Sequence, residues 1–192
     1  MNPAEDTAER AAGDGRSLAG RGRGAVLALA AVCALVNSPA LGPGFIHDDH
    51  PIIEQNERLR GLGRLPQIVT TGYWPPAEAA GPPLYRPLTL LSFALNQAAG
   101  GLRPFGFRLV NLLLHALNTV LVLHLAARLL SGPAGRAPGA PRPLDAPLLA
   151  GLLFAAHPVH TEALGEVVGR AELLGAAGVL GSVLAFLIGR EA

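Results

Sequence analysis

Long apolar runs are the feature that most constrains how this chain folds. The run at 107–130, FRLVNLLLHALNTVLVLHLAARLL, is long enough to cross the hydrocarbon core of a bilayer as one helix. The run at 25–41 is about long enough, the run at 144–157 is short, and the run at 173–188 is marginal. Charged residues make up only 15% of the chain, below the roughly 25% of a typical soluble domain. The sequence therefore predicts an all-α, multi-spanning membrane protein with four crossings.

The segments between the predicted spans differ in character. Residues 1–24 are polar and lack apolar periodicity, which is typical of a disordered tail. Residues 131–143 form a linker rich in proline and glycine, while 42–106 is a long loop and 158–172 a polar turn. The first apolar run has a second interpretation, because its length and the Ser-Pro-Ala after it resemble a cleaved signal peptide. Under either interpretation the loop that follows is exported.

Arginine placement predicts which side of the membrane each segment occupies. All 15 basic residues are arginines, and four alternating crossings place the tail, the linker and the C-terminal end on one side. The arginines of those three segments are Arg10, Arg16, Arg21, Arg23, Arg136, Arg142 and Arg190. The positive-inside rule therefore predicts that both termini are cytoplasmic and that 42–106 and 158–172 are outside, in the inner membrane if the source is bacterial. The net charge of +1 gives no indication of a nucleic-acid partner.

The long loop contains one clear helical pattern, LYRPLTLLSFALNQ. Pro87 suits the first position of a helix, and leucines recur at helical spacing at Leu84, Leu88, Leu91 and Leu95. We predict an amphipathic helix at 87–98 that lies in the membrane interface. A helix packed against other residues of the loop would show the same pattern.

Polar residues at membrane depth predict a pocket at the outer end of the spans. From Leu144 to Ala156 the third run has 13 residues, about 20 Å of helix against a hydrocarbon core of about 30 Å. The next segment must then begin below the outer surface, where polar non-helical backbone needs protein or water around it. The second run carries polar residues on one helical face, namely Arg108, Asn111, His115 and Asn118. Such a face suits either a cavity wall or interhelical hydrogen bonds. The residues expected at the pocket are His157, His160, Glu162, Glu166 and Arg170, with Asn111 and His115 from the second run.

Two adjacent aspartates, Asp48 and Asp49, follow the first run within FIHDDHPIIEQN. Their oxygens suit a hard divalent cation such as Mg²⁺ or Mn²⁺, so a metal held by this pair is one interpretation. A turn or cap before Pro51 is another. The segment HPVHTE does not match the zinc motif HExxH, because its glutamate follows the second histidine. A loosely held divalent cation is therefore the one cofactor that these residues suggest.

The order of the motifs resembles a known family. The segments FIHDDHPII, YRPLTLLSFALN, GFRLVNLLLHALN and HPVHTEALGEVVGRAELL follow one another as in the N-terminal membrane region of the transmembrane and tetratricopeptide-repeat proteins. The resemblance covers residues 25–188, and its last motif is the most specific. It implies a GT-C-type fold, of which this chain holds the first four helices and the ordered outer loop. It also implies an O-mannosyltransferase-like activity that uses a polyprenyl-phosphate sugar.

The resemblance further implies roles for individual residues. It makes Asp48 a general base and Asp49 a group that positions the acceptor or the base. The sugar would arrive from the membrane on a lipid phosphate and pass to a hydroxyl of a protein or other acceptor on the outer face. Because a guanidinium binds phosphate through paired hydrogen bonds, Arg86 and Arg170 are candidates to hold that phosphate. We therefore expect Asp48 to approach the 157–170 turn, with Arg86 or Arg170 on the membrane side.

The chain departs from the family in its length. Family members carry many more helices and a helical-repeat tail, so we interpret this chain as a fragment that is inactive alone. Two other functions stay open at this point. One is a non-catalytic membrane anchor for a tetratricopeptide-repeat interaction domain. The other is a small transporter or ion-pathway subunit, suggested by the polar face that holds Asn111 and His115.

Overall fold

The computed structural model describes residues 24–75, 84–130 and 146–190, and these form helices, turns and extended connections without a β-strand. Three helices are long and apolar enough to cross a membrane, namely Gly24–Leu41, α4 with its span Pro104–Leu130, and Val167–Gly189. A fourth apolar helix, α5 (Ala146–Ala156), has 11 residues. The prediction of an all-α membrane protein is confirmed. The predicted linker at 131–143 lies outside the described residues, as does the predicted tail at 1–24 apart from Gly24, where the N-terminal helix begins.

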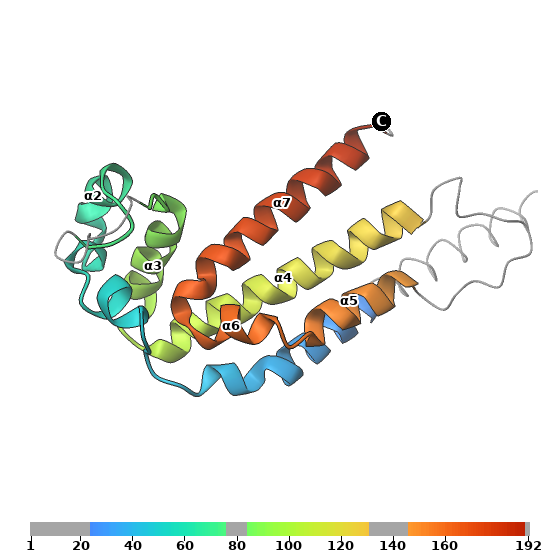
Figure 1. The fold of residues 1–192 in the computed structure, drawn as a ribbon, viewed down its shortest axis with the longest axis horizontal. Coiled ribbons are helices and arrows are strands. Elements are labelled where there is room, and N and C mark those ends of the chain that lie inside the picture. The colour runs from blue at the N-terminus through green and yellow to red at the C-terminus, as the bar shows by residue number, and fades with distance from the viewer. Residues whose placement is uncertain (1–23, 76–83, 131–145, 191–192) are drawn as a thin grey trace, which may run out of the picture.

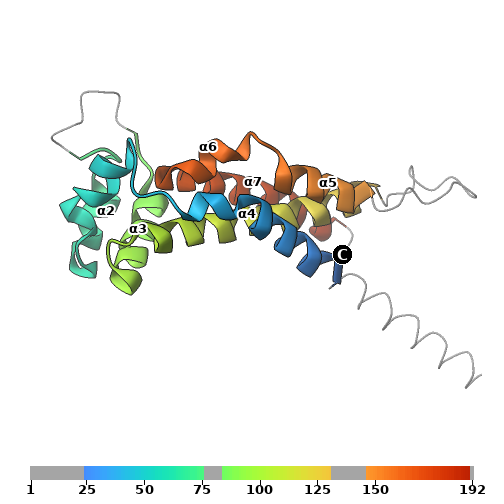
Figure 2. The same cartoon turned by 90° about the horizontal axis from the view of Figure 1, so that it is seen from below.

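The membrane helices lie side by side and the chain alternates in direction from one to the next (Figures 1 and 2). Helix α4 packs against both α5 and α7 (Arg170–Gly189). The N-terminal helix packs through Leu29 and Cys33 on Ala155 of α5. Gly151 allows this close approach, because a Cβ at that position would lie 2.7 Å from Cδ2 of Leu29. The alternation leaves the start of the N-terminal helix and the end of α7 at the same end of the bundle (Figure 1).

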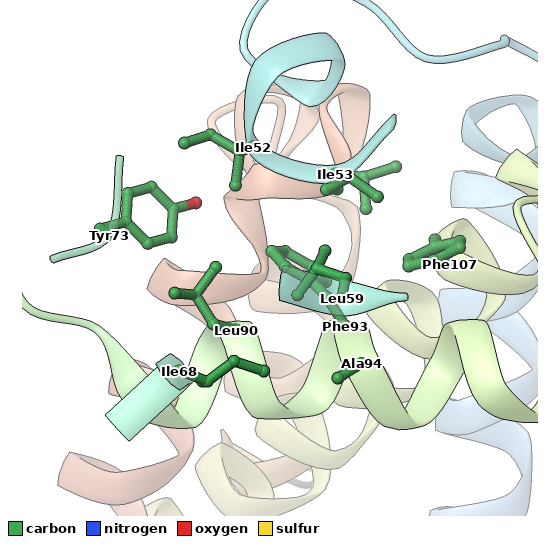
Figure 3. Packing of buried hydrophobic residues seen from close by; sticks show 10 residues of the cluster. Ile52, Ile53, Leu59, Ile68, Tyr73, Leu90, Phe93, Ala94 and Phe107 are labelled. Atoms are coloured by element: carbon green, nitrogen blue, oxygen red, sulfur yellow. The ribbon is translucent and has the colours of Figure 1, made fainter. Parts of the chain in front are cut away.

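The loop after the first span folds into a small unit of short helices at the other end of the bundle (Figure 1). Its elements are a π-helical turn His50–Glu54, 3-10 turns Glu57–Leu59 and Leu62–Arg64, α2 (Leu65–Thr70) and α3 (Pro87–Gly100). They enclose a cluster of buried side chains that includes Ile52, Leu59, Ile68, Leu90 and Phe93 (Figure 3). Phe107 of α4 and Val167 join this cluster and fix the unit onto the bundle.

Helix α3 has two apolar faces. One face buries Leu90, Phe93 and Ala94 in the loop cluster. The opposite leucines stay open, with Leu88 72% and Leu95 52% exposed. The first face therefore packs against other residues of the loop. Contact of the second face with the membrane interface stays a prediction.

The segment predicted as a polar turn at 158–172 is largely helical. It contains α6 (His160–Gly165) and a 3-10 turn at Val167–Gly169, and α7 begins at Arg170, before the expected boundary at 173. The chain turns tightly here and brings Gly169 against Ala163. A Cβ at Gly169 would therefore collide with the backbone of Ala163. Among the polar residues of this segment, Arg170 is buried and donates hydrogen bonds to acceptors on α3 and α4, whereas Glu162 stays exposed.

Candidate functional site

The segment after the first span lies directly against the segment after α6. The carboxylate of Asp49 accepts hydrogen bonds from Val168 N through Oδ1 at 2.9 Å and from Ile46 N through Oδ2 at 3.2 Å. His47 Nδ1 lies 2.9 Å from Glu166 Oε1. Both long-range contacts join residues 119 positions apart in the chain. The acidic pair and the polar segment around 166–168 therefore form one structure at the end of the bundle that carries the loop unit.

The two neighbouring aspartates face different surroundings. Asp49 is completely buried, while Asp48 is exposed. The preceding His47 has a φ of 43°, a left-handed conformation that non-glycine residues rarely adopt and that costs about 1–3 kcal/mol. A strained conformation persists only where surrounding contacts hold it. Here the hydrogen bonds of Asp49 and the contact of His47 with Glu166 do so. The strained turn thus anchors Asp49 inside and leaves Asp48 outside.

Arg108 of α4 supports the buried aspartate from the membrane side. Its Nη1 donates to the carbonyl oxygens of Gly165 at 2.7 Å and Ala40 at 3.2 Å, and its Nη2 donates to that of Gly44 at 2.6 Å. Nη2 also lies 4.0 Å from Oδ2 of Asp49. One buried guanidinium therefore joins the end of the first span, the start of the loop and the end of α6. The sequence placed Arg108 on the polar face of its helix but did not identify this role.

A cavity of about 580 Å³ opens beside Asp48. Its wall combines the loop unit, α6 and the first turn of α7, and it holds more anionic than cationic groups. The charged residues that line it are Asp48, Glu162, Glu166, Glu172 and Arg86, and its aromatic residues are Tyr73 and Trp74. Of the expected pocket residues, Asp48, Glu162, Glu166 and Arg86 meet at this cavity.

Arg86 is the cation of the cavity wall. It precedes α3, its Nη2 lies 3.4 Å from Oε1 of Glu172, and its guanidinium sits 5.5 Å from the centre of the Tyr73 ring. Burial raises the pKa of Tyr73, although the charge of Arg86 opposes the shift. The Tyr73 hydroxyl has no hydrogen-bond partner among the described residues. Among the described residues, the hydrogen-bond acceptor of the Arg86 side chain is Glu172, which Nη2 contacts.

A second arginine of the loop, Arg58, holds the backbone of the segment that carries the aromatic residue Tyr73. Arg58 is buried, and its Nη1 donates to Thr71 Oγ1 and to the Gly72 carbonyl, each at 2.7 Å. Its Nη2 donates to the Tyr73 carbonyl at 3.0 Å. Burial lowers the pKa of Arg58, yet three carbonyl and hydroxyl acceptors compensate for the lost hydration. Sequence analysis missed Arg58, because nothing in its spacing separates it from the neighbouring exposed arginines.

Arg170 does not lie where a phosphate would need it, and this corrects the expectation for that residue. Its side chain is fully buried at the start of α7. Nε donates to Asn111 Oδ1 at 2.8 Å, and Nη2 donates to Asn96 Oδ1 at 2.9 Å and to the Phe107 carbonyl at 2.8 Å. The guanidinium also stacks over Phe93, 4.7 Å from the ring centre. Arg170 thus ties α3, α4 and α7 together, and its donors are already occupied by protein acceptors.

Three other expected pocket residues also serve the packing of the helices. Asn111 donates to the Val167 carbonyl at 3.0 Å. His115 is buried, with Nε2 3.3 Å from the Ala155 carbonyl oxygen and its ring 4.6 Å from that of His160. Burial and the neighbouring histidines lower the pKa of His160. Of these three, only His115 contacts a carbonyl group where α5 ends. Neither they nor the exposed His157 line the cavity.

The residues do not fit the divalent cation that the acidic pair suggested. Both oxygens of Asp49 accept backbone hydrogen bonds, and Asp48 faces away from them into the cavity. Across 24–75, 84–130 and 146–190, no three His, Cys, Asp or Glu side chains converge as metal ligands would. The site residues therefore act through their hydrogen bonds and charges.

Comparison with known proteins identifies the relatives of the chain. No family model and no solved structure matches it. It is 39% identical over 135 residues to the protein O-mannosyl-transferase Tmtc1 of Drosophila melanogaster, a match that covers 69% of this chain and 14% of that protein. It is 40% identical over 138 residues to the protein O-mannosyl-transferase TMTC4 of Homo sapiens, covering 68% of this chain and 18% of that protein.

A third relative extends the match further along this chain. The protein O-mannosyl-transferase Tmtc2 of Drosophila melanogaster is 39% identical over 150 residues, which cover 77% of this chain and 15% of that protein. The chain thus spans less than a fifth of the length of the relatives it matches. On this likeness, and with the membrane helices and the loop motifs in place, the chain belongs to the family of transmembrane and tetratricopeptide-repeat protein O-mannosyl-transferases.

Proposed function

We propose that this region forms part of the active site of a membrane glycosyltransferase. The enzyme would move a mannose-like sugar from a polyprenyl-phosphate donor to a hydroxyl of a protein acceptor on the outer face of the membrane. One observation carries the proposal: of two adjacent aspartates, Asp49 is buried and fixed while Asp48 faces a cavity. The relatives, whose names describe protein O-mannosyl-transferases, support the reaction class.

In the proposed reaction the acceptor oxygen attacks the anomeric carbon of the sugar. The bond between that carbon and the phosphate oxygen breaks, and the lipid phosphate leaves with the bonding electrons. The carboxylate of Asp48 takes the proton of the acceptor hydroxyl, because it is the exposed member of the pair and lies in the cavity wall. Asp49 positions Asp48 by fixing the turn between Ile46 and Val168.

Arg86 is the residue that we assign to the leaving phosphate. It lines the same cavity as Asp48, and it keeps donors that its contact with Glu172 does not use. An anionic leaving group is stabilised by a guanidinium through charge-assisted hydrogen bonds. Arg170, whose donors are occupied within the protein, has a positioning role through α3, α4 and α7.

The proposed orientation places both termini in the cytoplasm and the cavity outside. It rests on the arginine distribution and on the alternating directions of the helices (Figure 1). Reporter fusions after residue 60 and after residue 190 should therefore give opposite signals, outside and inside. A cytoplasmic signal at residue 60 would place Asp48 on the cytoplasmic side, which would contradict the proposal.

The catalytic role of Asp48 is tested in the full-length protein with Asp48→Asn. This change keeps the size of the side chain but removes the basic lone pair, so turnover should fall by about 10²–10⁴-fold. Glu54→Gln is the matched control, because Glu54 is an exposed carboxylate that pairs with His50 outside the cavity. Sugar transfer from polyprenyl-phosphate mannose to an acceptor peptide is the measurement. Unchanged turnover in Asp48→Asn would favour a non-catalytic membrane anchor instead.

A further inference from the structure

The cavity beside Asp48 is strongly anionic. The carboxylates of Asp48, Glu162, Glu166 and Glu172 line it, against the guanidinium of Arg86 among the described residues. The whole chain has a net charge of +1, so this excess of negative charge is local to the cavity. A concave wall of one sign raises the local concentration of ligands that carry the opposite charge. A lipid phosphate is itself an anion, and the excess of carboxylates therefore points to the acceptor.

Glu162 is the carboxylate of the cavity that has no other task. Glu166 is paired with the His47 ring, at 2.9 Å, and Glu172 with the arginine of the wall, at 3.4 Å. Asp48 is the proposed general base. Within the described residues no ion pair or hydrogen bond reaches the side chain of Glu162, which is exposed. Its charge is therefore available to a ligand.

The surroundings of Glu162 suit a long basic side chain. On the same face of α6 the apolar Val159 also lines the cavity and is 62% exposed. The loop unit contributes Trp74, a partly exposed aromatic ring, to the wall. Lysine and arginine combine an apolar stem with a cationic head, and the face of an indole ring attracts a cation. Val159 and Trp74 can thus contact the stem while Glu162 neutralises the head.

Tyr73 gives a separate indication that the cavity takes a ligand with polar atoms. It lines the cavity and is only 3% exposed. Its hydroxyl has no hydrogen-bond partner among the described residues. Buried hydroxyls are normally paired, because an unpaired one keeps the full cost of its lost hydration. The carbonyl and N–H groups of a bound peptide would provide the missing partner.

We propose that the cavity selects protein acceptors with a basic residue close to the reacting hydroxyl, and that Glu162 and Trp74 hold that basic side chain. This inference rests on the proposed function and adds the chemical class of the acceptor. An acidic residue in the same place of the acceptor is repelled by the carboxylates of the wall. The charge of the cavity thus sets which hydroxyl groups are presented to Asp48.

Acceptor peptides test this preference on the full-length protein in nanodiscs of phosphatidylcholine, with saturating polyprenyl-phosphate mannose. Each peptide has one threonine and one lysine, and the lysine is moved through the three positions before and after the threonine. Matched peptides carry norleucine, which keeps the apolar stem, or glutamate in place of lysine. At the best position kcat/KM should be about tenfold higher for lysine than for norleucine, because a cation–π contact and an exposed ion pair each contribute a few-fold. Glutamate should give the lowest value.

Glu162→Gln removes the charge at nearly constant size. The ratio of kcat/KM for lysine over norleucine should fall about three- to fivefold, as expected for the loss of an exposed ion pair. Glu162→Lys should reverse the preference in favour of glutamate. Because Glu162 is exposed, both variants should fold. Glu54→Gln is the matched control, since it removes an exposed carboxylate that pairs with His50 outside the cavity, and it should keep the full preference.

Three results would overturn the inference. One is an equal kcat/KM for the lysine and norleucine peptides at every position in the wild type. Another is a full lysine preference that survives in Glu162→Gln. The third is the same loss of preference in Glu54→Gln, which would mean that the general charge of the surface, and not this cavity, attracts basic peptides.

Peptide binding, measured by fluorescence anisotropy alongside sugar transfer, separates this inference from the proposed function. Lysine-dependent binding that is lost in Glu162→Gln, without sugar transfer to any peptide, would contradict the proposed enzyme and keep the site for a basic chain. Sugar transfer without a preference for lysine would keep the enzyme and exclude this class of acceptor.

Discussion

The two ends of the helix bundle are joined by different kinds of contact. At the end that carries the loop unit, Arg108, Asn111 and Arg170 are buried and bond to carbonyl and amide oxygens of the neighbouring segments. Toward the other end, the N-terminal helix meets α5 through apolar contacts such as that of Leu29 with Gly151. Helix α7 separates from α4 along its length toward the C-terminal end (Figure 1).

The difference shows where the geometry of the bundle is determined. Lipid tails are as apolar as leucine, so apolar contacts between membrane helices give little preference for one arrangement over another. Hydrogen bonds from a buried guanidinium have fixed directions, and a broken one leaves unpaired groups in a place that water does not reach. The polar end is therefore the more sharply defined end, and it carries Asp48 and the cavity.

The largest effect should come from removing the cation that joins three helices. Arg170→Met leaves the acceptors on Asn111, Asn96 and Phe107 unpaired. We expect it to lower the free energy of unfolding by about 3–5 kcal/mol, since each unsatisfied buried acceptor costs about 1–3 kcal/mol. Unfolding in mixed detergent micelles, followed by circular dichroism, measures it. The control Arg190→Met changes an exposed arginine near the end of α7 and should change stability by less than about 0.5 kcal/mol. Similar values for the two would mean that Arg170 does not hold the bundle.

Composition and run length were enough to predict the membrane helices. The family resemblance, not spacing, suggested that Asp48 and Arg86 lie near the 157–170 turn, and Asp48, Arg86 and Glu162 line one cavity in the structure. The assignment of Arg170 failed for a physical reason. A guanidinium near the outer end of a span suits a lipid phosphate or buried carbonyl groups equally well by type. The choice depends on the positions of Asn96, Asn111 and Phe107, which come from three-dimensional packing.

The short third run illustrates the same limit. Its length predicted polar backbone at membrane depth after Ala156, which stays a prediction. In the structure Arg108 and Asn111 donate hydrogen bonds to the backbone carbonyls of Gly165 and Val167. Sequence reasoning treated the polar side chains there as walls of a cavity. The structure instead uses His115 to satisfy the Ala155 carbonyl at the end of α5. Local patterns identify polar groups that need partners, but they do not identify the partners.

A smaller effect should separate the two adjacent aspartates. Asp49→Asn replaces one acceptor oxygen with an N–H₂ donor, which then faces the N–H of Ile46 or of Val168. We expect this change to lower the free energy of unfolding by about 1–3 kcal/mol, the cost of an unsatisfied buried group. Asp48→Asn, at an exposed position, should cost less than about 0.5 kcal/mol. Equal destabilisation by both would mean that Asp48 also supports the turn, and its loss of turnover would then not report on a catalytic base.

The smallest effect is expected at the apolar contact. In Gly151→Ala the new Cβ would lie 2.7 Å from Cδ2 of Leu29, and that atom is the end of a flexible side chain that can rotate. Alanine also favours the helix by up to about 1 kcal/mol over glycine, which offsets a modest overpacking cost of about 1–3 kcal/mol. The net change in the free energy of unfolding should therefore stay within about 1–2 kcal/mol. Gly178→Ala gives the reference, because a Cβ there meets nothing within 4 Å and only the helix preference remains. The difference between the two variants measures the Leu29 contact itself. A difference as large as the effect of Arg170→Met would show that the apolar end defines the bundle as firmly as the polar end does.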